Sequence, residues 1–268
     1  MTELYHNALS TCSQKVRLVL AEKGLEFTSH PIDLVGGGQH DPDYVRLNPN
    51  HVVPTLIDGE RVLIESTLIN EYLDDAYPEI PLRPSDAPGR HAMRMWTKRI
   101  DDKVHPMAGV ITFGIGARPL LLRRPPEDLE ANIAAIPDPR RRAARRSVIE
   151  HGAKAPEMRG ALEAFVRFLD DMESGLASSP WLAGDAFSLA DACALPYVLR
   201  LDHLAMDPLL APDARPRVAD WYARVQARPT YQTAVSAWLP EPMVELFRSN
   251  GREAWPDIEP LTKLAAQA

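Results

Sequence analysis

Two serine hydroxyl groups and a thiol lie within four positions near the start of the chain, at Ser10, Cys12 and Ser13. Residues 3–6 are typical of a short strand and a helix follows it, so these side chains fall where a strand turns into a helix. The unpaired N–H groups and the positive dipole end of a helix N-terminus stabilise an anion and lower the pKa of a thiol. The sequence therefore predicts a thiolate here, from Cys12 itself or from a thiol cofactor.

A second group of residues is suited to a peptide ligand. Val53 and Pro54 precede a predicted hairpin over residues 55–64. If the bond before Pro54 is cis, the Val53 main chain turns outward and can pair with an extended peptide. Glu65 and Ser66 then open an amphipathic helix, whose N-terminus suits a carboxylate while Glu65 accepts from an ammonium. Sulfur, peptide, carboxylate and amine together describe glutathione, the co-substrate that we expect.

The order of these elements resembles the thioredoxin-like N-terminal domain of cytosolic glutathione transferases. Ser188 and Asp191 resemble the capping box that opens a core helix in the all-helical second domain of that family. The resemblance implies an α/β thioredoxin-like domain followed by an all-α domain, and a cis bond before Pro54.

Three subgroups of the family resemble parts of the chain. Residues 10–24 and 43–48 are similar to tetrachlorohydroquinone reductive dehalogenases and to ganglioside-induced differentiation-associated proteins. Residues 82–86 and 93–98 are similar to bacterial glutathione-dependent β-aryl etherases.

The resemblance gives the three candidate catalytic residues different roles. Ser10 aligns with the serine of theta, delta and zeta transferases, Cys12 with the nucleophilic cysteine of the reductive dehalogenases, and Ser13 with a serine of the etherases. A serine hydroxyl would donate a hydrogen bond to the glutathione thiolate, whereas Cys12 would attack a glutathione adduct and form a mixed disulfide. The serines are also typical helix caps, and Cys12 could be a buried structural thiol.

The remaining site residues also come from the resemblance. Gln39 and His40 match a pair in the etherases that would contact the glycyl carboxylate of glutathione, which completes a site with Val53, Pro54, Glu65 and Ser66. His105 matches a histidine of beta-class transferases that faces the second substrate. A solvent-facing histidine beside Pro106 is the alternative reading of His105.

The chain is expected to form two domains joined by a linker. Residues 1–78 would be the thioredoxin-like glutathione-binding domain, 79–89 a proline-rich linker that cannot be regular helix, and 90–268 an all-helical domain with the second-substrate pocket. Helical patterns cover residues 90–108, 160–176, 189–206 and 215–227. Prolines break residues 109–157 into short helices and loops, and the arginine run at 140–146 reads as a solvated helix face without assigned function.

Composition narrows the possible partners. The 268 residues carry a net charge of −7, which gives no reason to expect a nucleic-acid partner. Two cysteines, Cys12 and Cys193, provide no disulfide framework and fit a reducing compartment. The start of the chain lacks a secretory pattern, and the apolar stretch at 107–116 is too short for a membrane span. We expect a cytoplasmic protein without metal or membrane partner; the resemblance implies a homodimer.

Two kinds of function therefore compete. The first is a glutathione transferase that directs the glutathione thiolate onto an electrophilic, aromatic small molecule, in conjugation or β-aryl ether cleavage. An alternative chemistry for such an enzyme is glutathione-dependent reductive dehalogenation or thiol exchange through Cys12. The second is a non-catalytic binding module with the same fold. The residues at Gln39, Val53, Pro54, Glu65 and Ser66 favour the enzyme, because they form a site rather than only a fold.

Overall fold

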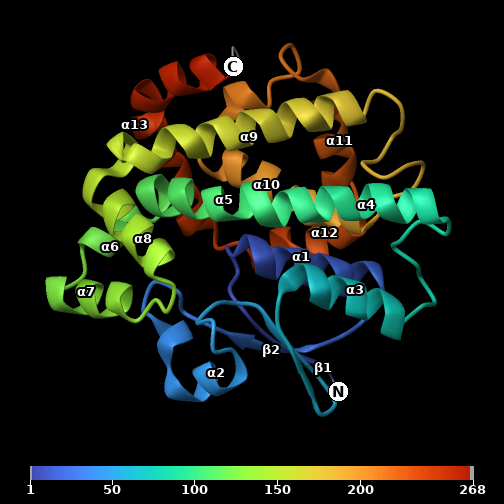
Figure 1. Cartoon of the computed structure of the whole chain (residues 1–268), viewed down its shortest axis with the longest axis horizontal. Helices are drawn as coiled ribbons and strands as arrows, with labels where there is room; N and C mark the ends of the chain where they lie inside the picture. Colours follow the sequence, from blue (N-terminus) through green and yellow to red (C-terminus); the bar gives the residue numbers. More distant parts are fainter. Residues whose placement is uncertain (1, 266–268) are drawn as a thin grey trace. The chain divides into compact units, whose positions relative to one another are not determined.

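The computed structural model describes residues 2–265, and residues 1 and 266–268 lie outside the described part (Figure 1). The chain divides into two compact units that are not contiguous in sequence. Unit 1 comprises Met1–Lys98, Ser178–Pro196 and Trp221–Pro240, and unit 2 comprises Arg99–Ala177, Tyr197–Asp220 and Glu241–Ala268. The domain limits expected at residues 78 and 90 stay a prediction.

Unit 1 is built on a four-stranded sheet in the order β2-β1-β3-β4. β1 pairs in parallel with β2 and antiparallel with β3, and β3 pairs antiparallel with β4. Since a parallel pair needs a crossover, a helix must join β1 to β2, and α1 is that helix. The strands are β1 (Thr2–His6), β2 (Thr28–Pro31), β3 (Thr55–Asp58) and β4 (Arg61–Leu63), and the joining helix is α1 (Thr11–Glu22).

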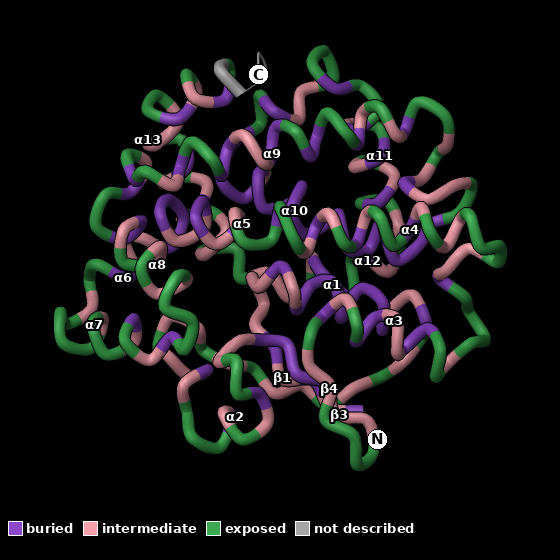
Figure 2. The backbone as a smooth tube through the Cα atoms, in the orientation of Figure 1, coloured by how far each residue is buried: buried purple, intermediate pink, exposed green. Residues whose placement is uncertain are grey.

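Side chains of β1 alternate between the two faces of the sheet. His6 is buried and contacts Arg17 of α1. Tyr5 points to the other face, where its ring lies 5.9 Å from that of Tyr44 in α2 (Pro42–Leu47). α1 and α2 therefore cover opposite faces, and Figure 2 marks the buried residues of β1 and α1 in purple. With α3 (Ser66–Ala76) packed beside α1, this is the predicted thioredoxin-like arrangement.

Further helices of unit 1 surround a buried carboxylate. Asp191 accepts hydrogen bonds from Ser188 N and Oγ, from Leu182 N and from Trp221 Nε1, at 2.9–3.0 Å. Ser188 Oγ in turn accepts from Ala190 N at 3.2 Å. This is the predicted capping box, and it opens α10 (Leu189–His203). Burial raises the pKa of Asp191 above its ordinary value.

Several other helical elements are assigned wholly or partly to unit 1. They are η1 (Gly38–His40), α4 (Ala87–Arg99), α11 (Pro216–Gln226), α12 (Pro229–Ala234) and η6 (Ser236–Trp238).

Unit 2 begins with a helix that runs further than the sequence predicts. The helical pattern ends near residue 108, but the structure continues through η2 (Ile100–Val104), α5 (His105–Ile111) and η3 (Thr112–Gly116). η2 and η3 are π-helical, and the His105 N–H bonds to Ile100 O. Pro106 lacks an N–H and cannot donate a helical hydrogen bond. The π turn before it shifts the pattern of main-chain hydrogen bonds, so the helix continues past the proline.

Residues 118–154 form the short helices that the prolines predict. α6 (Arg118–Leu122), α7 (Pro126–Ala134) and α8 (Pro139–His151) each carry proline at N1 or N2, followed by η4 (Gly152–Lys154). The core of unit 2 lies along α9 (Pro156–Gly175), which packs on α13 (Glu241–Ala265) and α5. η5 (Asp207–Leu209) follows α10. Within the described residues, no helix is long and apolar enough to cross a membrane.

Candidate active site

The N-terminus of α1 carries all three candidate catalytic residues. Ser10 is the N-cap, and its Oγ accepts from Ser13 N at 3.3 Å, which leaves the hydroxyl hydrogen of Ser10 for another acceptor. Ser10 and Cys12 are half-buried. Ser13 is fully buried, and its Oγ accepts from Asn7 N at 3.2 Å. Ser10 and Cys12 are therefore accessible to a ligand, while Ser13 holds the loop that precedes them.

The buried Arg17 holds the loop that precedes α1. Arg17 is 1% exposed and donates to Asn7 O at 3.1 Å, to Ala8 O at 2.9 Å and to Ala234 O at 2.8 Å. Its guanidinium also lies 5.4 Å from the ring centroid of Trp238. Burial lowers the pKa of Arg17 to about 9. Two charge-assisted hydrogen bonds therefore hold the loop that carries Ser10, and the third joins Arg17 to Ala234 at the end of α12.

The partner of Arg17 on the sheet is a neutral histidine. His6 Nδ1 lies 3.0 Å from Arg17 Nη1 and must accept, because a guanidinium only donates. His6 Nε2 lies 2.8 Å from Ser29 Oγ and so carries the ring hydrogen. Burial and the charge of Arg17 lower the pKa of His6 to about 4.

The N-terminus of α3 is the second predicted anion site. Ser66 is buried at the first position of α3, and Glu65, with φ 69°, is the exposed N-cap residue. Glu65 Oε1 accepts from Asn50 Nδ2 at 3.4 Å. The buried Lys15 of α1 donates from Nζ to Thr67 Oγ1 at 3.2 Å. That bond ties α1 to the first turn of α3.

The Val53–Pro54 peptide bond is cis, as the sequence predicts. Tyr44 Oη donates to Val52 O at 2.5 Å and Asn48 Nδ2 donates to the same oxygen at 2.9 Å, which fixes the preceding residue. Burial raises the pKa of Tyr44, so its hydroxyl stays a donor. The Val53 main chain makes no hydrogen bond to any other residue that the structure describes.

Two histidines and an amide form a chain beside η1. Gln39 Nε2 lies 2.9 Å from His40 Nε2, and His40 Nδ1 lies 2.8 Å from His51 Nδ1. An amide nitrogen only donates, so a neutral His40 carries its hydrogen on Nδ1 and donates it to His51. Gln39 is 7% exposed, and within residues 2–265 its Oε1 has no hydrogen-bond partner. The arrangement leaves a buried acceptor for a ligand N–H.

Known proteins resemble the chain over nearly its whole length. Residues 9–76 match the family model described as the glutathione S-transferase N-terminal domain, and residues 141–224 match that of the C-terminal domain. Glutathione S-transferase 3 of Zea mays is 34% identical, over 90% of this chain and 96% of that protein. This chain belongs to the glutathione S-transferase family. The predicted family, its fold and its enzymatic class are thereby confirmed.

Two of the predicted subgroups are among the relatives of this transferase. The tetrachloro-p-hydroquinone reductive dehalogenase of Sphingobium chlorophenolicum is 31% identical, over 86% of this chain and 94% of that protein. The crystal structure of β-etherase LigF from Sphingobium sp. strain SYK-6 superposes with a TM-score of 0.80 at 27% identity, covering 88% of this chain and 99% of that one.

The predicted site residues of this transferase divide between the two units. All of those expected to contact glutathione or its sulfur lie in unit 1, namely Ser10, Cys12, Ser13, Gln39, His40, Val53, Pro54, Glu65 and Ser66. His105 lies in unit 2 at the first position of α5, where it is exposed and its Nδ1 lies 3.1 Å from Tyr197 Oη.

Sequence reasoning missed His51, although it stands directly before the Val-Val-Pro segment. Its φ of 53° is unusual for a residue with a side chain, and the imidazole is placed against His40. The proximity of a second histidine to the Val-Pro pair was the available signal.

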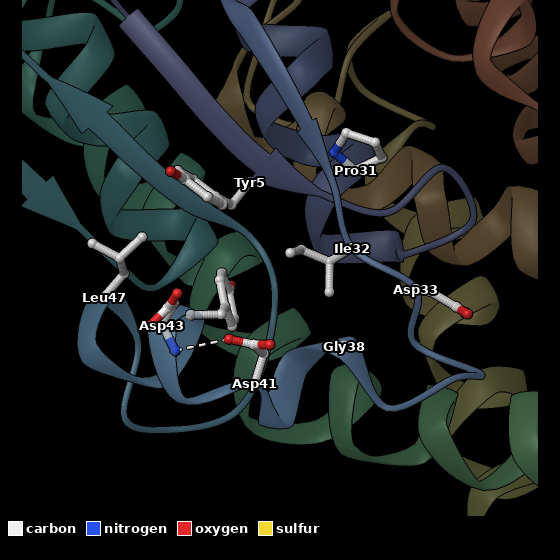
Figure 3. A pocket seen from close by; sticks show the side chains of 9 residues that line it. Tyr5, Pro31, Ile32, Asp33, Gly38, Asp41, Asp43 and Leu47 are labelled. Carbon is white, nitrogen blue, oxygen red and sulfur yellow. Dashed lines mark hydrogen bonds between the residues drawn. The ribbon is translucent and has the colours of Figure 1, made fainter.

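An open hollow of about 330 Å³ lies beside α2 but holds none of the predicted site residues of this transferase (Figure 3). Its carboxylates serve the local fold. Asp33 accepts from Val35 N and Gly36 N, Asp41 caps α2 through Asp43 N, and Asp43 pairs with Arg46. Each of these three carboxylates is therefore already bonded within the protein.

Proposed function

We propose that this transferase binds glutathione against the Val53 main chain and presents its sulfur as a thiolate at the N-terminus of α1. The thiolate attacks an electrophilic carbon of an aromatic small molecule. The observation that carries the proposal is the main chain of Val53, whose N–H and C=O have no partner within residues 2–265. The same unit contains the N-termini of α1 and α3, which Lys15 and Thr67 join.

Each part of glutathione has a chemically matched group in unit 1. The Val53 N–H and C=O pair with the cysteinyl main chain, as in strand addition. The N-terminus of α3 at Ser66 takes the γ-glutamyl carboxylate, and Glu65 takes the ammonium. Gln39 and His40 are proposed to lie at the glycyl end, where Gln39 Oε1, a buried acceptor without a partner in residues 2–265, accepts the glycyl N–H. His105 is proposed to contact the second substrate.

The Ser10 hydroxyl and the N–H groups of α1 stabilise the thiolate. Ser10 Oγ already accepts from Ser13 N, so its hydrogen is the one that can be donated to sulfur. The thiol proton passes to water, the sulfur forms a bond to carbon, and the bond to the leaving group breaks. The leaving group departs with the bonding electron pair as halide, or as an aryl oxide that takes a proton from water.

Reductive chemistry through Cys12 is the second candidate. Cys12 is half-buried at the same helix end, and a relative with 31% identity is named a reductive dehalogenase. In this scheme the Cys12 thiolate attacks the sulfur of a glutathione adduct, an S–S bond forms, and the carbon–sulfur bond breaks as the carbon takes a proton. A second glutathione then displaces Cys12 and leaves as glutathione disulfide.

A thermal-shift titration of the full chain with glutathione tests the binding step. A ligand that binds only the folded protein stabilises it by RT ln(1 + [L]/Kd), about 2.7 kcal/mol at a hundredfold excess over Kd. S-methylglutathione should bind in the same way, because the proposed contacts leave its sulfur pointing at the helix end. A flat response to both ligands contradicts the proposal.

Single replacement of the site residues separates the two chemistries. Turnover of an activated aryl halide with glutathione should fall in Ser10→Ala and persist in Cys12→Ala. The opposite pattern, with glutathione disulfide as a product, favours the reductive scheme.

The assembly and location of the enzyme follow from the family resemblance alone. We propose a homodimer that works in the cytoplasm. Light scattering of the purified chain checks the assembly, with a mass of twice 29.8 kDa expected. A monomeric mass contradicts it.

A further inference from the structure

His51 is the last member of a hydrogen-bond chain that begins at Gln39, and all of its members lie in unit 1. Gln39 Nε2 donates to His40 Nε2 at 2.9 Å, and His40 Nδ1 donates to His51 Nδ1 at 2.8 Å. Both donors therefore point from Gln39 towards His51. The chain leaves one oxygen over at its buried end, because Gln39 Oε1 has no partner within residues 2–265.

The direction of this chain depends on the acceptor that His51 supplies. A neutral imidazole carries its hydrogen on one nitrogen, and the bond made by the other nitrogen decides which one. With His51 Nδ1 as the acceptor, His40 keeps its hydrogen on Nδ1, and its Nε2 accepts from the Gln39 amide. Without that acceptor, His40 can carry its hydrogen on Nε2 and donate it to Gln39 Oε1. The Gln39 amide would then turn over and present its nitrogen where Oε1 now lies.

The backbone around His51 is fixed by bonds that do not involve the imidazole. His51 N donates to Asn48 O at 3.1 Å, and Val52 O accepts from Tyr44 Oη and Asn48 Nδ2. The φ of His51 is 53°, in the left-handed region that glycine and asparagine adopt more readily than histidine. The backbone conformation therefore does not favour a histidine at this position, whereas the bond to His40 requires a side chain with an acceptor.

We propose that His51 is a positioning residue which, through His40, keeps the oxygen of the Gln39 amide rather than its nitrogen available to glutathione. The inference rests on the proposed function, because Gln39 Oε1 is the group assigned there to the glycyl N–H. A ligand with an ester oxygen in place of that N–H leaves the buried oxygen unpaired. The site should therefore discriminate against it.

Two ligands that differ in one group test the inference. The S-methyl derivatives of γ-glutamylcysteine ethylamide and γ-glutamylcysteine ethyl ester have the same shape, but the first carries an N–H where the second carries an oxygen. In calorimetric titrations of the full chain, the wild type should bind the amide roughly tenfold to hundredfold more tightly than the ester. His51→Gly, which adopts the observed φ without strain, should reduce that ratio to about threefold or less, chiefly by weakening the amide.

Two matched variants separate the acceptor from the loop that carries it. Asparagine also tolerates a positive φ, and its Oδ1 can accept from His40 Nδ1, so His51→Asn should keep most of the preference for the amide. Asn50 donates to Glu65, which is assigned to the γ-glutamyl end that both ligands share. Asn50→Ala should therefore change both affinities equally and leave their ratio at the wild-type value.

Equal binding of the two ligands by the wild type, or an unchanged ratio in His51→Gly, overturns the inference. A ratio lost as completely in His51→Asn or in Asn50→Ala as in His51→Gly also overturns it, because the loss would then belong to the loop and not to the acceptor. Failure of the proposed function gives a different result. The wild-type chain would then show no thermal shift with glutathione and would bind neither ligand.

Discussion

Burial lowers the pKa of both Arg17 in unit 1 and Arg145 in unit 2, but Arg17 is fully buried whereas Arg145 is half-buried, and the two differ in their hydrogen-bond partners. Burial brings the pKa of each to about 9, and each lies over an aromatic ring, that of Trp238 or that of Phe113. Arg17 donates to three main-chain carbonyls and to His6, whereas Arg145 donates to no residue in the described chain. A buried charge whose hydrogen bonds are made within the protein supports the fold, whereas Arg145 is held in place by its aromatic contact.

Replacing Arg17 and Arg145 in turn should have the largest difference in effect on the free energy of unfolding. Arg17→Met leaves the carbonyls of Asn7, Ala8 and Ala234 without their donor, and should lower the free energy of unfolding by about 3 kcal/mol. Arg145→Met removes a charge without protein hydrogen bonds and should change it by less than about 0.5 kcal/mol. Urea denaturation measures both. Equal losses in the two variants would erase the distinction.

The pH dependence of stability should report the neutral histidine beside Arg17. Unfolded His6 takes up a proton below its ordinary pKa of 6.5, but folded His6 does so only below about 4. The unfolded state therefore binds more protons between these values, and stability falls as the pH falls from about 6.5 to about 4, by about 3 kcal/mol from this residue.

His6→Asn is the matched variant for that measurement. Asparagine keeps an acceptor near the position of Nδ1 but does not titrate, so the acid-side slope should become shallower. His203, whose pKa burial lowers to about 3, stays in both proteins and contributes equally. An identical slope in the variant would mean that His6 is not the group responsible.

The loop that Arg17 holds should matter for sulfur as well. Ser10→Ala removes the donor to the thiolate and should raise the pKa of bound glutathione by about one unit, equivalent to about 1.4 kcal/mol. Thiolate absorbance of the complex as a function of pH measures it. Cys12→Ala is the control for a side chain at the same helix end. A larger rise in Cys12→Ala than in Ser10→Ala would reverse the assigned roles.

The regular elements were the most predictable part of the molecule. The strand–helix start, the hairpin before Glu65 and the capping box at Ser188 and Asp191 all have local sequence signals, and the structure contains each of them. The helix through Pro106 extended past its expected end because π turns absorb the proline, and no simple periodicity announces a π turn.

The contacts of individual polar side chains were less predictable. His51 meets His40 across eleven positions of a loop, so the pair depends on backbone turns that the residue types do not specify. Within the arginine run, Arg145 and Arg146 are chemically identical neighbours, and only their different helix faces send one to Phe113 and the other to Glu130. From the sequence alone, both residues belong to a run that is predicted to be a solvated helix face.

The pKa of the glutathione thiol in complex with the wild-type chain is the most direct test of the proposed thiolate site. It is measured as the pH midpoint of thiolate absorbance, with the S-methylglutathione complex as the blank. The proposed α1 site predicts a midpoint about two units below the ordinary value of about 8.5. A midpoint at the ordinary value, in a complex that the thermal shift shows to be formed, would contradict it.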